Sequence, residues 1–214
     1  MKITSPAFRE NATRALGDAT LQKALKNIEK GFIAKRILAA EALPEFERLR
    51  DAARDLKTHV LGHLDLYLEA YETKVIAAGG HVHWAETAED ARRIVADICK
   101  RLGAKTVTKG KSMITEEIAL NDHLEAEGLI PVETDLGEYI IQLRGEHPSH
   151  IVAPAVHLTK EQVAGDFRRV HTHLAAERDL SEPVTLLGEA RTVLREKFLA
   201  ADVGITGANF LVAE

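Results

Sequence analysis

Residues 79–115 read GGHVHWAETAEDARRIVADICKRLGAKTVTKGKSMIT, and this stretch decides the fold. Two short β-prone runs, 81–85 and 105–109, flank a segment with helical spacing of its apolar residues. That helix is predicted to begin after Thr87, whose hydroxyl suits an N-cap, and to end near Leu102. A strand, a helix and a second strand in succession are typical of a parallel sheet with helices packed on it. The stretch therefore predicts an α/β domain.

The same alternation continues downstream. Helices are predicted from Thr115 to about Glu127, after Thr159, and from about Thr185 to Ala201. Further strands are predicted at 129–133, 150–153 and 203–205, with Pro131 typical of an edge strand. We expect about five strands in a mostly parallel sheet, with helices on both faces.

Upstream of residue 79 the pattern is helical throughout. Apolar residues form a narrow stripe from Leu21 to Phe32 and a longer one from Phe46 to Val75, which ends at a glycine pair. We predict a helical N-terminal extension at 1–78 and an α/β domain at 79–214. The apolar stripe of the extension is expected to pack on the α/β domain or on a second copy of the chain.

Composition indicates a globular protein and excludes several classes. The 214 residues are 45% hydrophobic with a net charge of −5, so no basic footprint for nucleic acid is present. No stretch approaches the roughly 18 apolar residues of a spanning helix, and no signal peptide opens the chain. We expect a cytoplasmic protein without a membrane span. Because residues 202–214 run through an apolar segment without a polar tail, we also expect the α/β domain to be truncated there.

Polar residues follow several predicted strands, and the carboxyl ends of parallel strands share one edge of the sheet. We therefore expect one site for a small anionic metabolite there, with its backbone N–H groups and cations supplied by the loops. Its candidate residues are Lys109, Lys111, Ser112, Asp135, Glu138, His150, Thr206, Gly207 and Asn209.

The alternatives for these residues are structural. The Lys109–Ser112 run can equally form a solvated basic turn, and it lacks the upstream glycine of a P-loop. Asp135 and Glu138 can be helix-start acids, as we read Glu116. No metal site is predicted, because His81 and His83 are better explained as neighbours on the polar face of a strand. No residue is assigned a catalytic role.

Five segments together resemble the lactate utilization protein B family, iron–sulfur cluster-binding proteins with a LUD domain. They are residues 79–86, 111–118, 133–143, 148–155 and 201–210. The resemblance implies an α/β fold of the sugar-phosphate isomerase and CoA-transferase type. It also implies a further cysteine-rich, ferredoxin-like region with [4Fe–4S] clusters. It implies two partners in oxidising L-lactate to pyruvate: a Cys-rich protein and a second LUD-domain protein.

Three functions follow as hypotheses. The chain is the binding domain of an iron–sulfur oxidoreductase subunit, or a CoA-transferase-like or sugar-phosphate isomerase-like enzyme, or a helical module that docks partners or a second copy as a homo-oligomer. No cofactor is expected in the chain itself, since its single cysteine, Cys99, cannot supply the four thiolates of a cluster. We therefore expect the 214-residue chain alone to be inactive in lactate oxidation.

Overall fold

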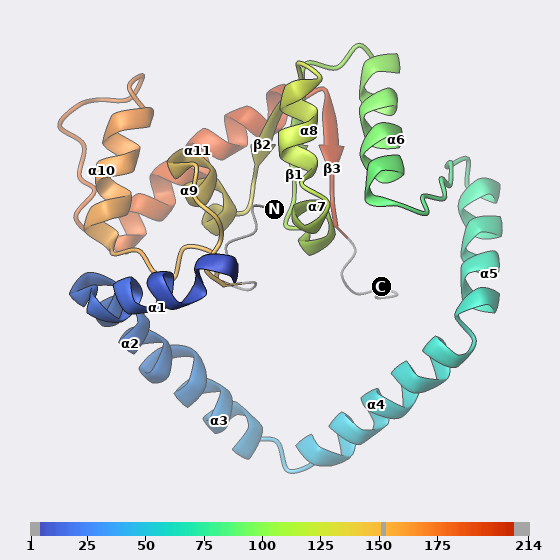
Figure 1. Ribbon diagram of the computed structural model, residues 1–214, viewed down its shortest axis with the longest axis horizontal. Helices are drawn as coiled ribbons and strands as arrows, with labels where there is room; N and C mark the ends of the chain where they lie inside the picture. The colour runs from blue at the N-terminus through green and yellow to red at the C-terminus, as the bar shows by residue number, and fades with distance from the viewer. Residues whose placement is uncertain (1–4, 151–152, 208–214) are drawn as a thin grey trace. The chain divides into compact units, whose positions relative to one another are not determined.

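The computed structural model describes residues 5–150 and 153–207 (Figure 1). The chain divides into two compact units. One, the sheet unit, combines residues 1–26 with 86–214, and the other, the helical unit, consists of residues 27–85. Every helix that the structure describes is too short or too polar to cross a membrane.

The sheet unit contains a parallel sheet of three strands in its described residues, in the order β2-β1-β3. Its strands are β1 (Thr106–Lys109), β2 (Ile130–Glu133) and β3 (Val203–Ile205). Lys109 lies in register with Glu133 on one side and with Ile205 on the other. The prediction of a parallel sheet is confirmed, and all three strands fall where the sequence placed them.

Helices cover both faces of the sheet. On one face, α6 (Ala88–Arg101) and α8 (Leu120–Ala126) form a hydrophobic cluster with Val107 of β1. Because side chains alternate along a strand, Thr106 and Thr108 point to the other face. Helix α11 (Pro183–Ala200) contacts β1, and the Thr106 hydroxyl lies 3.5 Å from the carbonyl oxygen of its last residue. The predicted α/β arrangement is therefore present.

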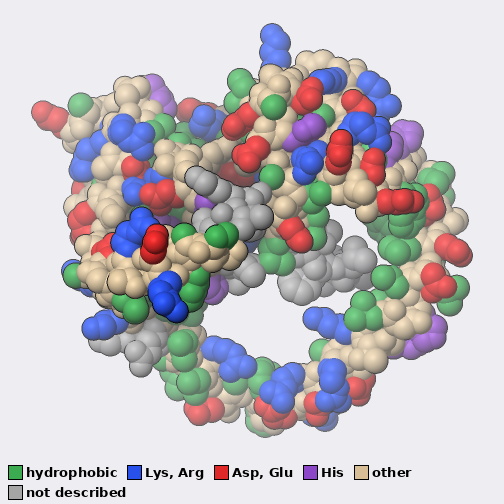
Figure 2. Space-filling model, viewed as in Figure 1, with side chains coloured by type: hydrophobic (Ala, Val, Ile, Leu, Met, Phe, Trp, Pro, Cys, Tyr) green, Lys and Arg blue, Asp and Glu red, His purple; other side chains and the backbone are tan. Residues whose placement is uncertain are grey.

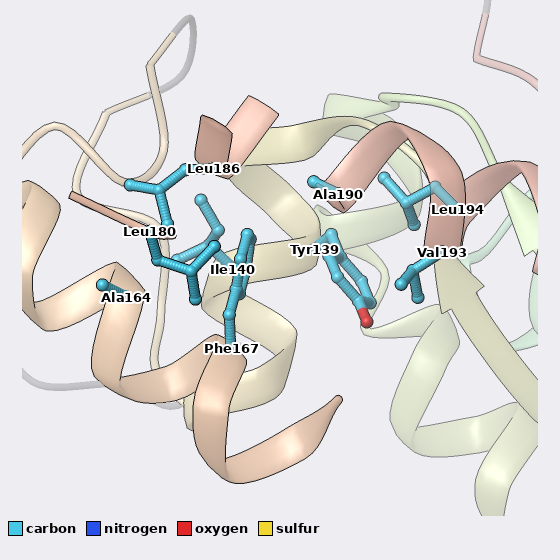
Figure 3. Close-up of a cluster of buried hydrophobic side chains, with 9 residues drawn as sticks. All are labelled: Tyr139, Ile140, Ala164, Phe167, Leu180, Leu186, Ala190, Val193 and Leu194. Carbon is cyan, nitrogen blue, oxygen red and sulfur yellow. The ribbon is translucent and has the colours of Figure 1, made fainter. Parts of the chain in front are cut away.

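A second hydrophobic cluster joins α11 to α9 (Leu136–Arg144) and α10 (Lys160–Val170). Figure 3 shows the ring of Phe167 from α10 beside Ile140 of α9, with Leu186 of α11 close to Leu180. Phe167 has no exposed surface. Burying an aromatic side chain of this size contributes roughly 1.5–3 kcal/mol, so this cluster holds the three helices as one body.

A buried polar network is attached to this cluster. The carboxylate of Glu189 can only accept hydrogen bonds, so the Nδ1–H of His171 donates to it across 2.7 Å. His171 Nε2 then accepts from the Tyr139 hydroxyl at 2.9 Å. Arg178 donates two further hydrogen bonds to Glu189, at 2.5 and 3.1 Å. Burial and the Glu189 charge together raise the pKa of Tyr139 to about 12, which keeps this hydroxyl a donor at any physiological pH.

The helical N-terminus that the sequence predicted is present. Its helices are α1 (Phe8–Gly17), α2 (Ala19–Ile28), α3 (Ala34–Glu41), α4 (Phe46–Gly62) and α5 (Leu64–Ala77), with a π-helical turn at Glu29–Ile33 and a 3₁₀ turn at Ser5–Ala7. No side chain described within the helical unit is buried. Hydrophobic side chains of this unit lie at its surface instead, as Figure 2 shows.

Three local predictions were wrong. Residues 81–85 form no strand, since no neighbouring strand pairs with them, and Trp84 donates instead to Glu72 of α5. The helix expected from Thr115 to Glu127 is two helices, α7 (Met113–Glu117) and α8, separated by Ala119 at φ 51°. The apolar stripe from Phe46 to Val75 does not form one continuous helix, because the chain divides at His63, whose φ of −133° is not helical. For the strand expected at 150–153, residues 151–152 lie outside the described residues, and His150 and Ala153 are in no strand.

Candidate functional site

The loops after β1 and β3 meet at the carboxyl edge of the sheet. The Gly110 N–H donates to the Ile205 carbonyl at 2.7 Å. A Cβ placed on Gly207 would lie only 2.2 Å from the Cβ of Ser112, so only glycine fits beside that serine. Thr206 lies next to Gly110 and so belongs to the contact between the two loops. The structure thus brings the Gly110–Ser112 and Thr206–Gly207 loops together. The predicted residue Asn209 lies outside the described residues.

Beside these loops lies a group of charged and amide side chains, which we call the lysine–carboxylate cluster. It consists of Lys109, Lys111, Glu116, Asn121, Glu133 and Glu138. The residues come from the ends of β1 and β2 and from the first turns of α8 and α9, together with α7. The cluster therefore depends on every element that surrounds the sheet edge on this side.

The inner half of the cluster is a buried triad. Lys109 is 1% exposed, and its ammonium donates to Glu133 Oε1 at 2.6 Å and to Asn121 Oδ1 at 2.8 Å. The Asn121 amide donates to the same Glu133 oxygen at 2.7 Å. The register of β1 and β2 places the lysine and the glutamate directly opposite each other. The triad thus neutralises its own charge inside the protein.

The outer half is more accessible. Lys111 donates to Glu138 Oε1 at 2.8 Å, and the lysine side chain is 27% exposed while the glutamate side chain is 7% exposed. The backbone N–H of Glu138 is capped by the carboxylate of Asp135, which begins α9. Asp135 is therefore a helix cap, the structural alternative that the sequence left open. Ser112 likewise caps α7 by accepting from the Thr115 N–H at 3.2 Å.

Glu116 completes the outer half. Burial, a hydrogen bond to the Glu138 carboxylate and the charges of Glu138 and Glu133 raise its pKa to about 7, against the opposing charge of Lys111. A hydrogen bond between two carboxyl groups requires one proton, so Glu116 holds a proton next to Glu138 at and below neutral pH. A carboxyl group whose pKa lies near 7, as that of Glu116 does, is suited to acid–base chemistry.

A pocket of about 350 Å³ opens onto the cluster. Of the predicted site residues, Lys109 and Glu138 line it, and Lys111 is joined to it through Glu138. His147 also lines the pocket, whereas His150 does not and instead accepts from the Ala153 N–H at 3.2 Å. Both lysines of the cluster already have carboxylate partners, Glu133 for Lys109 and Glu138 for Lys111.

Three members of the cluster were missed by sequence reasoning. Glu116 was read only as a helix-start acid, and Glu133 only as the end of a strand. Asn121 reaches the cluster because the left-handed residue Ala119 changes the direction of the chain at the start of α8. One signal was available: a lysine at the end of a buried strand requires a counter-ion, and Glu133 ends the neighbouring strand.

The described side chains offer no group of three potential metal ligands. Cys99 is buried in the hydrophobic cluster between α6 and the sheet, where burial raises the pKa of its thiol. This thiol therefore packs within the hydrophobic core.

A comparison with protein families matches residues 68–214 to the LUD domain. The chain belongs to the LUD-domain family. Its relatives include "Lactate utilization protein B" of Bacillus velezensis, 43% identical over all of this chain and 44% of that protein, and the same-named protein of Bacillus subtilis, 41% identical. The "Uncharacterized electron transport protein YkgF" of Escherichia coli is 40% identical over the same shares. The chain thus spans a little under half the length of these curated relatives, and no solved structure matches it.

The LUD domain should become more stable as the pH falls from 8 to 6. The pKa of Glu116 rises from its ordinary 4.5 to about 7 on folding, so between these values the folded chain binds the extra proton. After allowance for solvent screening, the gain is on the order of 1–2 kcal/mol. Urea unfolding at pH 6, 7 and 8 measures it, and Glu116→Gln should remove most of the slope. An unchanged slope in that variant would place the titrating group elsewhere.

Proposed function

We propose that this LUD domain is part of an iron–sulfur subunit that takes part in oxidising L-lactate to pyruvate. We further propose that its lysine–carboxylate cluster binds a small carboxylate metabolite. The family membership and the names of the relatives support the first statement. The partners would be those implied by the resemblance, a Cys-rich protein and a second LUD-domain protein, in the cytoplasm.

The chain's own residues do not fit an iron–sulfur cluster. A [4Fe–4S] cluster takes four thiolates, and the sequence holds one cysteine, which is 1% exposed within the core. The proposal therefore assigns any cluster to a part of the full-length protein outside this chain. The LUD domain would bind and position the carboxylate metabolite.

The position of Lys111 is the observation that carries the binding proposal. Its ammonium has three N–H donors, and among the described residues it donates one hydrogen bond, to Glu138. Its side chain is partly exposed, unlike that of Lys109. The remaining N–H donors of Lys111 can bind a ligand carboxylate at a small desolvation cost. A charge-assisted hydrogen bond of this kind is about twice as strong as a neutral one.

The carboxyl pair adds selectivity. With Glu116 protonated, Lys111, Glu116 and Glu138 together carry no net charge, so a monoanion meets no net repulsion from these three groups. The protonated carboxyl can donate a hydrogen bond to a hydroxyl or carboxylate oxygen of the ligand. Both features suit a small 2-hydroxy acid such as lactate. Above pH 7 Glu116 ionises, so binding of the anion should weaken.

Calorimetric titration tests this proposal. L-Lactate should bind the wild type, and Lys111→Ala should weaken binding at least tenfold, because a hydrogen bond to a charged group is worth about 1.5–3 kcal/mol. Lys197→Ala, an exposed lysine on α11, is the matched control and should bind like the wild type. Phosphate and CoA serve as competing ligands. Equal binding by the wild type and Lys111→Ala would remove Lys111 from the site.

The role within a redox system gives a separate expectation. The purified 214-residue chain should be colourless, contain no stoichiometric iron or acid-labile sulfide, and fail to reduce a dye with L-lactate. Dye reduction should appear only with the full-length protein and its partner subunits. Iron analysis and a dye-reduction assay measure both. Lactate-dependent dye reduction by this chain alone would contradict the assignment of the redox centre to other parts.

A further inference from the structure

Helix α11 has two apolar faces. Its inner face places Leu186, Ala190, Val193 and Leu194 in the hydrophobic cluster with α9 and α10 (Figure 3). Its outer face carries further large apolar residues that remain exposed: Val184, Leu187, Phe198 and Leu199. A helix that is apolar on more than one face is usually covered on more than one face. The outer face of α11 is therefore a candidate interaction surface.

A groove of about 750 Å³ runs along this outer face. Leu187 and Phe198 line it from α11, and Leu136 lines it from the start of α9. Arg191 and Arg195 stand in the same groove, one helical turn apart. Neither guanidinium forms an ion pair or a side-chain hydrogen bond with the described residues. Glu196 also lines the groove. The groove therefore combines apolar walls with two cations, four residues apart, and one carboxylate.

Helix α5 has the complementary pattern. Asp65 and Glu69 are also one turn apart, and helical geometry places Leu68 and Ile76 on the same side. Neither carboxylate forms an ion pair or a side-chain hydrogen bond with the described residues. Leu64 and Leu66 of this helix are also exposed, and Tyr67 and Tyr71 are about half exposed. Polar residues, Glu72 to Lys74, occupy the positions between these apolar residues. Such a helix also requires a covering surface.

We propose that α5 of a second copy of this chain occupies the α11 groove, with Asp65 and Glu69 paired to Arg191 and Arg195. An apolar helix set into an apolar groove is an established mode of recognition, and charge pairs at matched spacing fix its register. In a two-fold dimer each chain gives one helix and receives one, so the contact forms twice. The proposal is independent of the ligand that the lysine–carboxylate cluster binds.

Charge exchange between two variants tests the pairing. One variant carries Arg191→Glu with Arg195→Glu, and the other carries Asp65→Lys with Glu69→Lys. Each variant alone faces like charges in both contacts, so its dimer dissociation constant should rise at least about 100-fold. An equimolar mixture matches opposite charges in both contacts and should restore the dimer. Sedimentation velocity measures all three samples, and Arg101→Glu, at the exposed end of α6, is the control.

Each result decides the proposal. A wild type that stays monomeric at about 100 μM would overturn it, including the case in which α5 covers the groove of its own chain. Dimers that survive both double substitutions would place the interface elsewhere. Circular dichroism checks that each variant is folded, and recovery in the mixture excludes misfolding as the cause of dissociation. Folded monomeric variants that fail to associate when mixed would overturn the pairing of these four residues.

Discussion

Lys109→Met should destabilise the LUD domain by about 3–5 kcal/mol, the usual cost of removing one partner from a buried ion pair. Glu133 has a 7% exposed side chain, and in this variant its carboxylate would keep only the Asn121 amide. An uncompensated charge at that depth must be hydrated or protonated, and both cost free energy. Chemical denaturation followed by circular dichroism at pH 7 measures the loss. This is one of the two largest effects that we expect from a single substitution.

Two further variants separate the effect of the Lys109 charge on stability from the effect of its side-chain volume. Lys109→Met combined with Glu133→Leu removes both charges and should recover most of the lost stability, because replacing a buried pair by apolar residues is often neutral. Lys105→Met changes an exposed lysine next to the same strand and should cost less than about 0.5 kcal/mol. A double variant as unstable as the single one would mean that Lys109 contributes through packing and not through its charge.

Glu189→Gln should cost a similar amount, about 3–5 kcal/mol, because this 7% exposed carboxylate is shared by the buried His171 and the partly buried Arg178. The substitution removes the charge that faces Arg178 and leaves one amide oxygen to accept from both His171 and Arg178. The loop after α10 would then lose its anchor to α11. Thermal unfolding and urea titration measure the change, with the exposed Glu177→Gln as the control. A loss below about 1 kcal/mol would show that the network is not a principal anchor.

The same carboxylate gives a pH dependence opposite to that of Glu116. Burial alone would raise the pKa of Glu189, but the hydrogen bonds from Arg178 and His171 outweigh burial and lower it. A carboxyl group with a lowered pKa stabilises the fold above its ordinary value of 4.5 and loses that contribution as the pH falls through its folded value. In Glu189→Gln, acid unfolding should therefore be less steep below about pH 4.5.

Local signals in the sequence were enough to find the framework of the sheet unit. The β-branched runs predicted β1 and β3, and Thr87 and Thr159 cap their helices as expected. Local signals failed where the outcome depends on a distant neighbour. The run at 81–85 has strand-forming residues but no strand beside it, so it forms no sheet. The left-handed residue Ala119 costs roughly 1–2 kcal/mol, and no sequence pattern indicated that packing would offset this cost.

In the candidate site, too, some features follow from local signals in the sequence and others depend on distant neighbours. The sequence grouped Lys109, Lys111 and Glu138 because each lies at or after a predicted strand, and the structure places all three in one cluster. Partner choice was not predictable from position, because Glu133 and Asn121 reach Lys109 only through the strand register and the turn before α8. The result is a cluster of nearly balanced charge, in which each lysine has a carboxylate partner.

The strand order β2-β1-β3 has a consequence for biosynthesis. The central strand β1 finds its first neighbour, β2, within about two dozen residues, but its other edge pairs with β3 almost a hundred residues later. At about 5–20 residues per second, a ribosome exposes that unpaired edge for roughly 5–20 s. An open strand edge is a template for association with other chains. Nascent chains of this protein should therefore depend on chaperone protection until Val203–Ile205 has emerged.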